Sequence, residues 1–215
     1  MSKTFRKALI PILILIIALL VTYVLFIFAQ RNVCKEELNH YRLLSKEQHK
    51  IDMKEIRRIN EEEERIQNIL VTWIYKNSSN ISKTTSKEIA INLLSTKYPL
   101  LIACIIKSES NFNPSAKSKK GAIGLGQIMK QHEKRLINTG IIKEFRDIYN
   151  IYNGIMSTEY IFTEELKRAK GDVSKALEVY VGGNNSKYIN QIITDFFKLH
   201  YKCKYQKEIQ PEKEK

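Results

Sequence analysis

The stretch that decides the fold runs from Ile105 to Met129 and reads IIKSESNFNPSAKSKKGAIGLGQIM. Its apolar segment ends on a carboxylate, Glu109, and a proline and three glycines follow. In a helix over 100–109, Glu109 continues the stripe of Leu101 and Ile105 at a spacing of four. Partial burial there raises the carboxyl pKa, as a general acid near neutral pH requires. The pattern predicts a glutamate at the rim of a cleft; the alternative is a helix-end glutamate that points to water.

The second half of this stretch has the composition of a close-packed loop. Gly121, Gly124 and Gly126 let the backbone pass close to another chain or to a ligand, although ordinary turns use glycines too. Gln127 offers a donor and an acceptor together. Because the residue before a proline avoids the α region, Asn113 and Pro114 are predicted to end the preceding helix.

Around this stretch the sequence predicts an all-α domain over 86–202. Thr85 and Glu88 fit a capping box that opens its first helix. Helical periodicity recurs, with no long alternating strand, at 86–96, 99–109, 126–137, 150–168, 172–180 and 185–200. Residues 203–215 are expected to form a charged, disordered tail.

The N-terminal part predicts a membrane anchor and a stalk. Residues 8–29 carry no charge, and as a helix they match the thickness of a bilayer's hydrocarbon core. A cleaved signal peptide is the alternative, but the apolar run is long for one and lacks a small-residue cleavage site. Residues 1–7 are expected in the cytoplasm, with 30–76 as a solvated helical stalk or weak coiled coil and 77–85 as a linker.

Charge and cysteine content limit which partners and cofactors we expect for the chain. The net charge of +13 attracts acidic wall polymers or anionic lipids, or it reflects a lysine-rich genome. Nothing resembles a nucleic-acid-reading motif, so no nucleic-acid partner is expected. The cysteines at 34, 104 and 203 lack metal-ligand spacing, and Cys104 is most simply a core residue. No metal and no cofactor are implied.

Together these residues resemble the family of lytic transglycosylases that share the soluble-lytic-transglycosylase fold, relatives of goose-type lysozyme. The resemblance covers 86–200 and is carried by four segments in the family's order, IIKSESNFNPSA, GAIGLGQIM, NIYNG and ALEVYVGG. Three positions depart from the family's pattern: Gly126 stands where a methionine is common, Lys130 where a proline is frequent, and Val181 where an asparagine is usual. The last change removes an amide that would hydrogen-bond to substrate.

The resemblance implies a one-carboxylate mechanism on peptidoglycan. Glu109 would protonate the glycosidic oxygen between N-acetylmuramic acid and N-acetylglucosamine, and then deprotonate the muramic C6 hydroxyl, which closes a 1,6-anhydro ring. Tyr180 is expected to reach the Glu109 carboxyl or the bound sugar. The substrate-binding residues expected beside these two are Gln127, Gly124, Ser110 and Tyr152.

Several side chains keep alternative roles. Tyr149, Tyr152 and Tyr188 either stack on sugar rings or pack in the core. A two-carboxylate mechanism would require a second acid in addition to Glu109. The candidates nearest in sequence are Glu144 and Asp147.

Three functions follow from these observations. The first is a membrane-anchored lytic transglycosylase on the periplasmic or cell-wall side, which opens the wall for an envelope-spanning assembly. The second is a lysozyme-type hydrolase of the same fold, which a second carboxylate in the cleft would favour. The third is a non-catalytic wall-binding scaffold.

Overall fold

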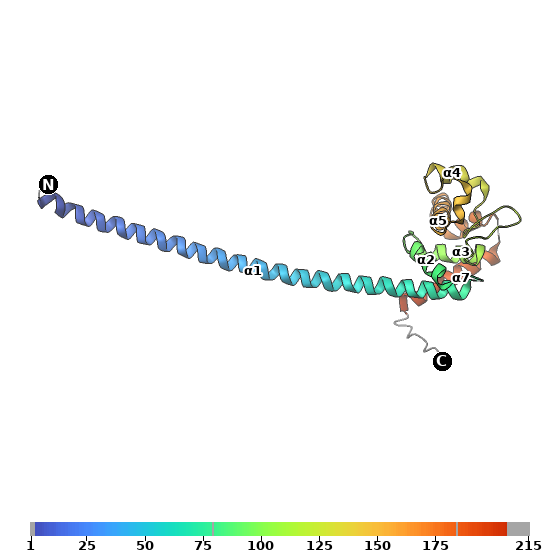
Figure 1. Cartoon of the computed structure of the whole chain (residues 1–215), viewed down its shortest axis with the longest axis horizontal. Coiled ribbons are helices and arrows are strands. Elements are labelled where there is room, and N and C mark those ends of the chain that lie inside the picture. Colours follow the sequence, from blue (N-terminus) through green and yellow to red (C-terminus); the bar gives the residue numbers. More distant parts are fainter. Residues whose placement is uncertain (1–2, 79, 184, 206–215) are drawn as a thin grey trace, which may run out of the picture. The chain divides into compact units, whose positions relative to one another are not determined.

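A computed structural model describes residues 3–78, 80–183 and 185–205, with only part of the side chains between 3 and 37 (Figure 1). The chain divides into two compact units, Met1–Asn60 and Glu61–Lys215. Within the described residues all regular elements are helices, and the only β-type pairing consists of isolated bridges among Lys117, Ile123 and Ile128. The predicted all-α fold is therefore confirmed.

Helix α1 spans Lys3–Asn77; its residues up to Asn60 belong to the first unit, and its last turns belong to the second unit. Ile51, Ile56 and Ile59 are about half exposed along it. Among the described residues, no helix is long and apolar enough to cross a membrane. The predicted span at 8–29 falls largely on side chains outside the description and stays a prediction. The tail predicted at 203–215 was placed too early, because α7 (Ser186–Tyr205) continues to Tyr205 and buries Cys203; residues 206–215 lie outside the description.

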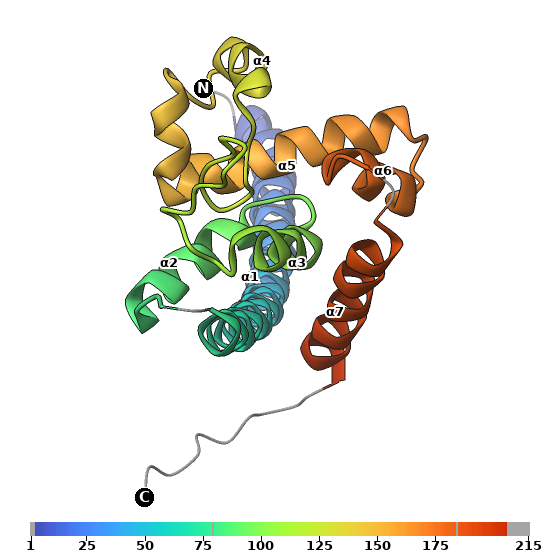
Figure 2. The ribbon, with the colours of Figure 1, turned by 90° about the vertical axis from the view of Figure 1, so that its right-hand side faces the viewer.

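The second unit is built around one central helix. Figure 2 shows α3 (Pro99–Ser110) with the other helices around it, and it packs against α2, α5 and α7. The helices that follow α1 in this unit are α2 (Lys83–Leu94), α3, α4 (Glu133–Asn138), α5 (Ile151–Arg168), α6 (Val173–Tyr180) and α7 (Ser186–Tyr205). Two short 3-10 helices, η1 (Lys130–His132) and η2 (Phe145–Tyr149), lie between α3 and α5.

The end of α1 belongs to the core of this unit, which differs from the predicted division into stalk, linker and domain. Ile69, Leu70, Trp73 and Ile74 are buried in the main hydrophobic cluster. The spacing of these four side chains puts them on one face of α1. The apolar area that they bury explains why the last turns of α1 pack on the domain. The second helix also begins earlier than predicted, because the Ser82 side chain, not Thr85, caps it.

Helix α3 ends by a backbone reversal that positions the loop after it. Asn111 and Phe112 adopt left-handed conformations, with φ of 49° and 61°. The N–H of Asn111 bonds to the Lys107 carbonyl, and Phe112 is fully buried with its ring 5.6 Å from that of Trp73. The helix therefore stops before the Asn113-Pro114 pair that was predicted to end it. A buried non-glycine residue at positive φ requires such tertiary packing.

Candidate active site

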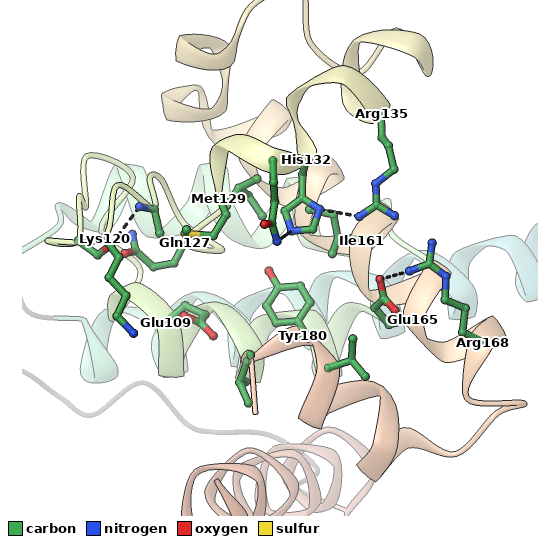
Figure 3. Close-up of a pocket in the computed structure, with 17 residues that line it drawn as sticks. Glu109, Lys120, Gln127, Met129, His132, Arg135, Ile161, Glu165, Arg168 and Tyr180 are labelled. Carbon is green, nitrogen blue, oxygen red and sulfur yellow. Dashed lines mark hydrogen bonds and ion pairs between the residues drawn. The ribbon is translucent and has the colours of Figure 1, made fainter. Parts of the chain in front are cut away.

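Glu109 lies on the last turn of α3 and lines a groove of about 630 Å³. The groove is bounded by the loop after α3, by η1 and α4, by the second half of α5 and by the end of α6 (Figure 3). Its polar lining residues include Glu109, Ser118, Lys120, Gln127, Gln131, His132, Arg135, Glu165, Arg168 and Tyr180. The predicted position of Glu109 at the rim of a cleft agrees with this geometry.

The environment of Glu109 favours its protonated form. Burial raises the pKa of this carboxyl to about 7, and a hydrogen bond with the Tyr188 side chain opposes part of that increase. A carboxylic acid with a pKa near 7 can give up its proton and recover it at neutral pH. The burial follows from the sequence, because Glu109 continues the apolar stripe that ends with the buried Ile105.

The Tyr180 hydroxyl bonds elsewhere than to the Glu109 carboxyl, which was one of its two expected partners. Because Tyr180 lines the groove, its contact with a bound sugar stays a prediction. Its hydroxyl donates to the Gly126 carbonyl at 2.9 Å and also hydrogen-bonds with the Thr158 side chain. Burial raises the pKa of Tyr180 well above its usual value, and the nearby Glu109 charge adds to this. The tyrosine that hydrogen-bonds to Glu109 is Tyr188, on α7. Tyr180 therefore ties α6 to the loop beside Glu109, whereas Tyr188 acts on the carboxyl itself.

Gly126 explains one departure from the family's pattern. A Cβ at this position would lie 1.9 Å from the Thr158 hydroxyl oxygen and 2.9 Å from the Tyr180 hydroxyl. Thr158 in turn donates to the Gly154 carbonyl at 2.8 Å. The space that a side chain would occupy is therefore filled by these two hydroxyls, and position 126 admits only glycine in this packing.

The four predicted substrate-binding residues separate into two groups. Gln127 lines the groove; it has a φ of 51°, and its side-chain amide donates to the Gly124 carbonyl at 3.0 Å. Gly124 is buried within the loop and does not line the groove, and a Cβ there would lie 2.7 Å from the Ile148 carbonyl oxygen. Ser110, which bonds back to the α3 backbone, and Tyr152, which is 51% exposed, do not line the groove. The lining of the groove therefore gives no support to the substrate contact predicted for these last two.

The acid that accompanies Glu109 in the groove is Glu165. Its side chain is only 6% exposed and forms a 2.7 Å ion pair with Arg168. Glu144 and Asp147, which were considered for this role, instead bond to each other's backbone in a capping box at η2. A sequence signal for Glu165 existed, because it follows the buried Thr158 and Ile161 on one face of α5.

One end of the groove is basic. Arg135, on α4, donates to the Nδ1 atom of His132 at 2.6 Å. Burial and the adjacent Arg135 charge lower the pKa of His132. Figure 3 shows the Arg135 and Arg168 guanidinium groups approaching from α4 and α5 at the same side of the groove. Sequence reasoning did not single out any of these three residues.

This geometry is that of a helical domain with a partly buried glutamate in a groove, and residues 89–194 match the family model described as "Transglycosylase SLT domain". This segment contains every residue that lines the groove. The domain belongs to the SLT transglycosylase family, which confirms the resemblance.

A protein from Enterobacteria phage PRD1 described as "Transglycosylase" is 38% identical over 87 residues, which are 40% of this chain and 30% of that protein. The matched part thus spans less than a third of the relative's length. No solved structure matches the chain.

Proposed function

We propose that the second unit is a peptidoglycan lytic transglycosylase that cleaves the β-1,4 bond between N-acetylmuramic acid and N-acetylglucosamine. The observation that carries the proposal is a glutamate, Glu109, with a pKa of about 7 in a groove large enough for sugar rings. The SLT family match and the phage transglycosylase relative agree with this activity.

In this mechanism Glu109 acts first as an acid and then as a base. Its proton passes to the glycosidic oxygen as the bond from muramic C1 to that oxygen breaks. The muramic C6 oxygen then bonds to C1, and its proton returns to the Glu109 carboxylate. The product ends in a 1,6-anhydro ring, and no water is consumed. Because the nucleophile belongs to the substrate, a single carboxyl group suffices.

Analysis of the digestion products tests the proposal. Purified protein incubated with peptidoglycan should release muropeptides that are lighter by one water than those with reducing ends. Glu109→Gln should abolish release, whereas Glu88→Gln, an exposed glutamate on α2, should retain it. Absence of products from the wild-type protein under conditions where it is folded would instead favour the wall-binding scaffold.

A hydrolase is the second candidate, and Glu165 is the observation that favours it. Its carboxylate lines the same groove as Glu109, and a second carboxylate in the groove is the group that a hydrolase needs to activate water. We rank it second because Glu165 is engaged by Arg168, and Figure 3 shows the Tyr180 ring between the two acids in projection. Products with reducing ends that disappear in Glu165→Gln would establish the hydrolase.

We further propose that residues 8–29 anchor the chain in a membrane, with the N-terminus in the cytoplasm and the catalytic unit on the wall side. The support is the uncharged run of about 22 residues, which corresponds to roughly 33 Å of helix. On this proposal, activity is confined to wall near the membrane, as local opening for an envelope-spanning assembly requires. Deleting residues 1–30 should move the protein from the membrane to the soluble fraction, and unchanged membrane association would refute the anchor.

A further inference from the structure

The basic end of the groove contains two arginines that the mechanism above does not use. Arg135 and Arg168 both line the groove that contains Glu109, and they come from different helices. Arg168 is 60% exposed along its side chain, whereas its partner Glu165 is 6% exposed. The guanidinium of Arg168 is therefore open to a ligand even while it holds the buried carboxylate.

The charges at this end leave a net positive site. Glu165 neutralises one of the two guanidinium groups. His132 does not add a charge, because its Nδ1 accepts from Arg135, and the lowered pKa of the ring keeps it neutral. Each guanidinium has five N–H donors, and the bonds described here use one donor of Arg135 and one of Arg168. Two convergent guanidinium groups with spare donors match a carboxylate in shape and charge.

We propose that Arg135 and Arg168 bind a carboxylate of the peptide stem that hangs from the muramic acid residue. This inference rests on the proposed function, because that function puts a muramic sugar beside Glu109 in the same groove. The stem peptide is attached to that sugar and carries free carboxylates, so one ligand contains both the sugar and an anionic group for the arginines. The arginines thus make the enzyme prefer strands that still have their stems.

The first test compares two substrates. Glycan strands with intact stems and strands stripped of stems by an amidase are digested by wild type, Arg135→Gln and Lys134→Gln, the last an exposed α4 residue outside the groove. We expect wild type to prefer the stem-bearing strands in kcat/KM, and Arg135→Gln to lose about tenfold of that preference through KM. Lys134→Gln should keep the preference. An equal effect of Arg135→Gln on both substrates would overturn the proposal.

The second test measures binding in the absence of catalysis, so its result does not depend on whether the proposed reaction occurs. The Glu109→Gln protein is titrated by calorimetry with a disaccharide that carries a stem peptide, with the bare disaccharide, and with inorganic phosphate. The stem-bearing ligand should bind about tenfold more tightly than the bare one, and additional Arg135→Gln should remove the difference. Equal binding of the two sugars refutes the proposal, and so does phosphate that leaves the advantage of the stem-bearing sugar unchanged, because phosphate should compete with a carboxylate for the same guanidinium groups.

Arg168 requires its own design because removing it alone leaves Glu165 buried without its partner. The double variant Glu165→Gln/Arg168→Gln replaces the ion pair by two neutral amides of similar size. We expect the folded double variant, verified by circular dichroism, to lose the stem preference as Arg135→Gln does. Retention of the full preference would exclude Arg168 from the site.

Discussion

The hydrogen bond from Tyr188 to Glu109 leads to a specific prediction about pH dependence. Burial raises the pKa of Glu109 to about 7, and this hydrogen bond opposes part of that increase. Tyr188→Phe removes the donor, which destabilises the carboxylate more than the acid. A hydrogen bond to a charged group contributes about 1.5 kcal/mol, which corresponds to about one pH unit. Because the first step needs protonated Glu109, the alkaline limb of the activity profile should move upward by that amount.

The assay is a pH–rate profile on dye-labelled peptidoglycan between about pH 5 and pH 9. If protonation alone limits the rate, activity at pH 8 relative to its maximum should rise about fivefold in Tyr188→Phe. Tyr152→Phe, an exposed tyrosine outside the groove, should leave the limb in place. An alkaline limb that stays fixed, or that moves to lower pH, in Tyr188→Phe would refute the role assigned to this tyrosine.

Three further predictions concern stability. Burial raises the pKa of Glu109 from its ordinary value of 4.5 to about 7 in the folded state. The stability lost as pH rises through this window is therefore about 3 kcal/mol. Glu109→Gln should raise Tm at pH 8 and have little effect at pH 4. Gly126→Ala should destabilise the fold strongly, because its Cβ would lie 1.9 Å from a hydroxyl oxygen. Its control is Gly121→Ala, where the Cβ meets open space but φ is 84°. This control should reduce the free energy of unfolding by only about 1 kcal/mol. Trp73→Ala should reduce the free energy of unfolding in urea by about 3–5 kcal/mol, and the half-exposed Tyr75→Ala by less than about 1 kcal/mol. A Trp73→Ala loss no greater than that of Tyr75→Ala would contradict its place in the core.

Local patterns predicted the parts of the fold that depend on local chemistry. The helix over 99–109 and its terminal glutamate follow from an apolar run and a spacing of four, and both agree with α3 and the buried side of Glu109. The helix over 150–168 agrees with α5, which the Asn150 side chain caps. Such features depend on residues within a few turns of each other.

The features that sequence reasoning missed depend on contacts between distant segments. Nothing near Trp73 in the sequence indicates that it packs on Phe112, so the end of α1 looked like a stalk. Tyr188 is 79 residues from Glu109 along the chain, and only the packing of α7 on α3 brings them together. Glu165 was detectable from its buried helical face, but its pairing with Arg168 on that helix made it resemble an ordinary surface ion pair.

The burial of Trp73 and Ile74 limits how this domain can be exchanged between proteins during evolution. A recombination event that joined the SLT segment at residue 89 to a different N-terminal segment would expose the apolar side chains of α2 and α3 that pack against the end of α1. A successful fusion has to bring the last turns of α1 with it, or supply a helix of equivalent shape.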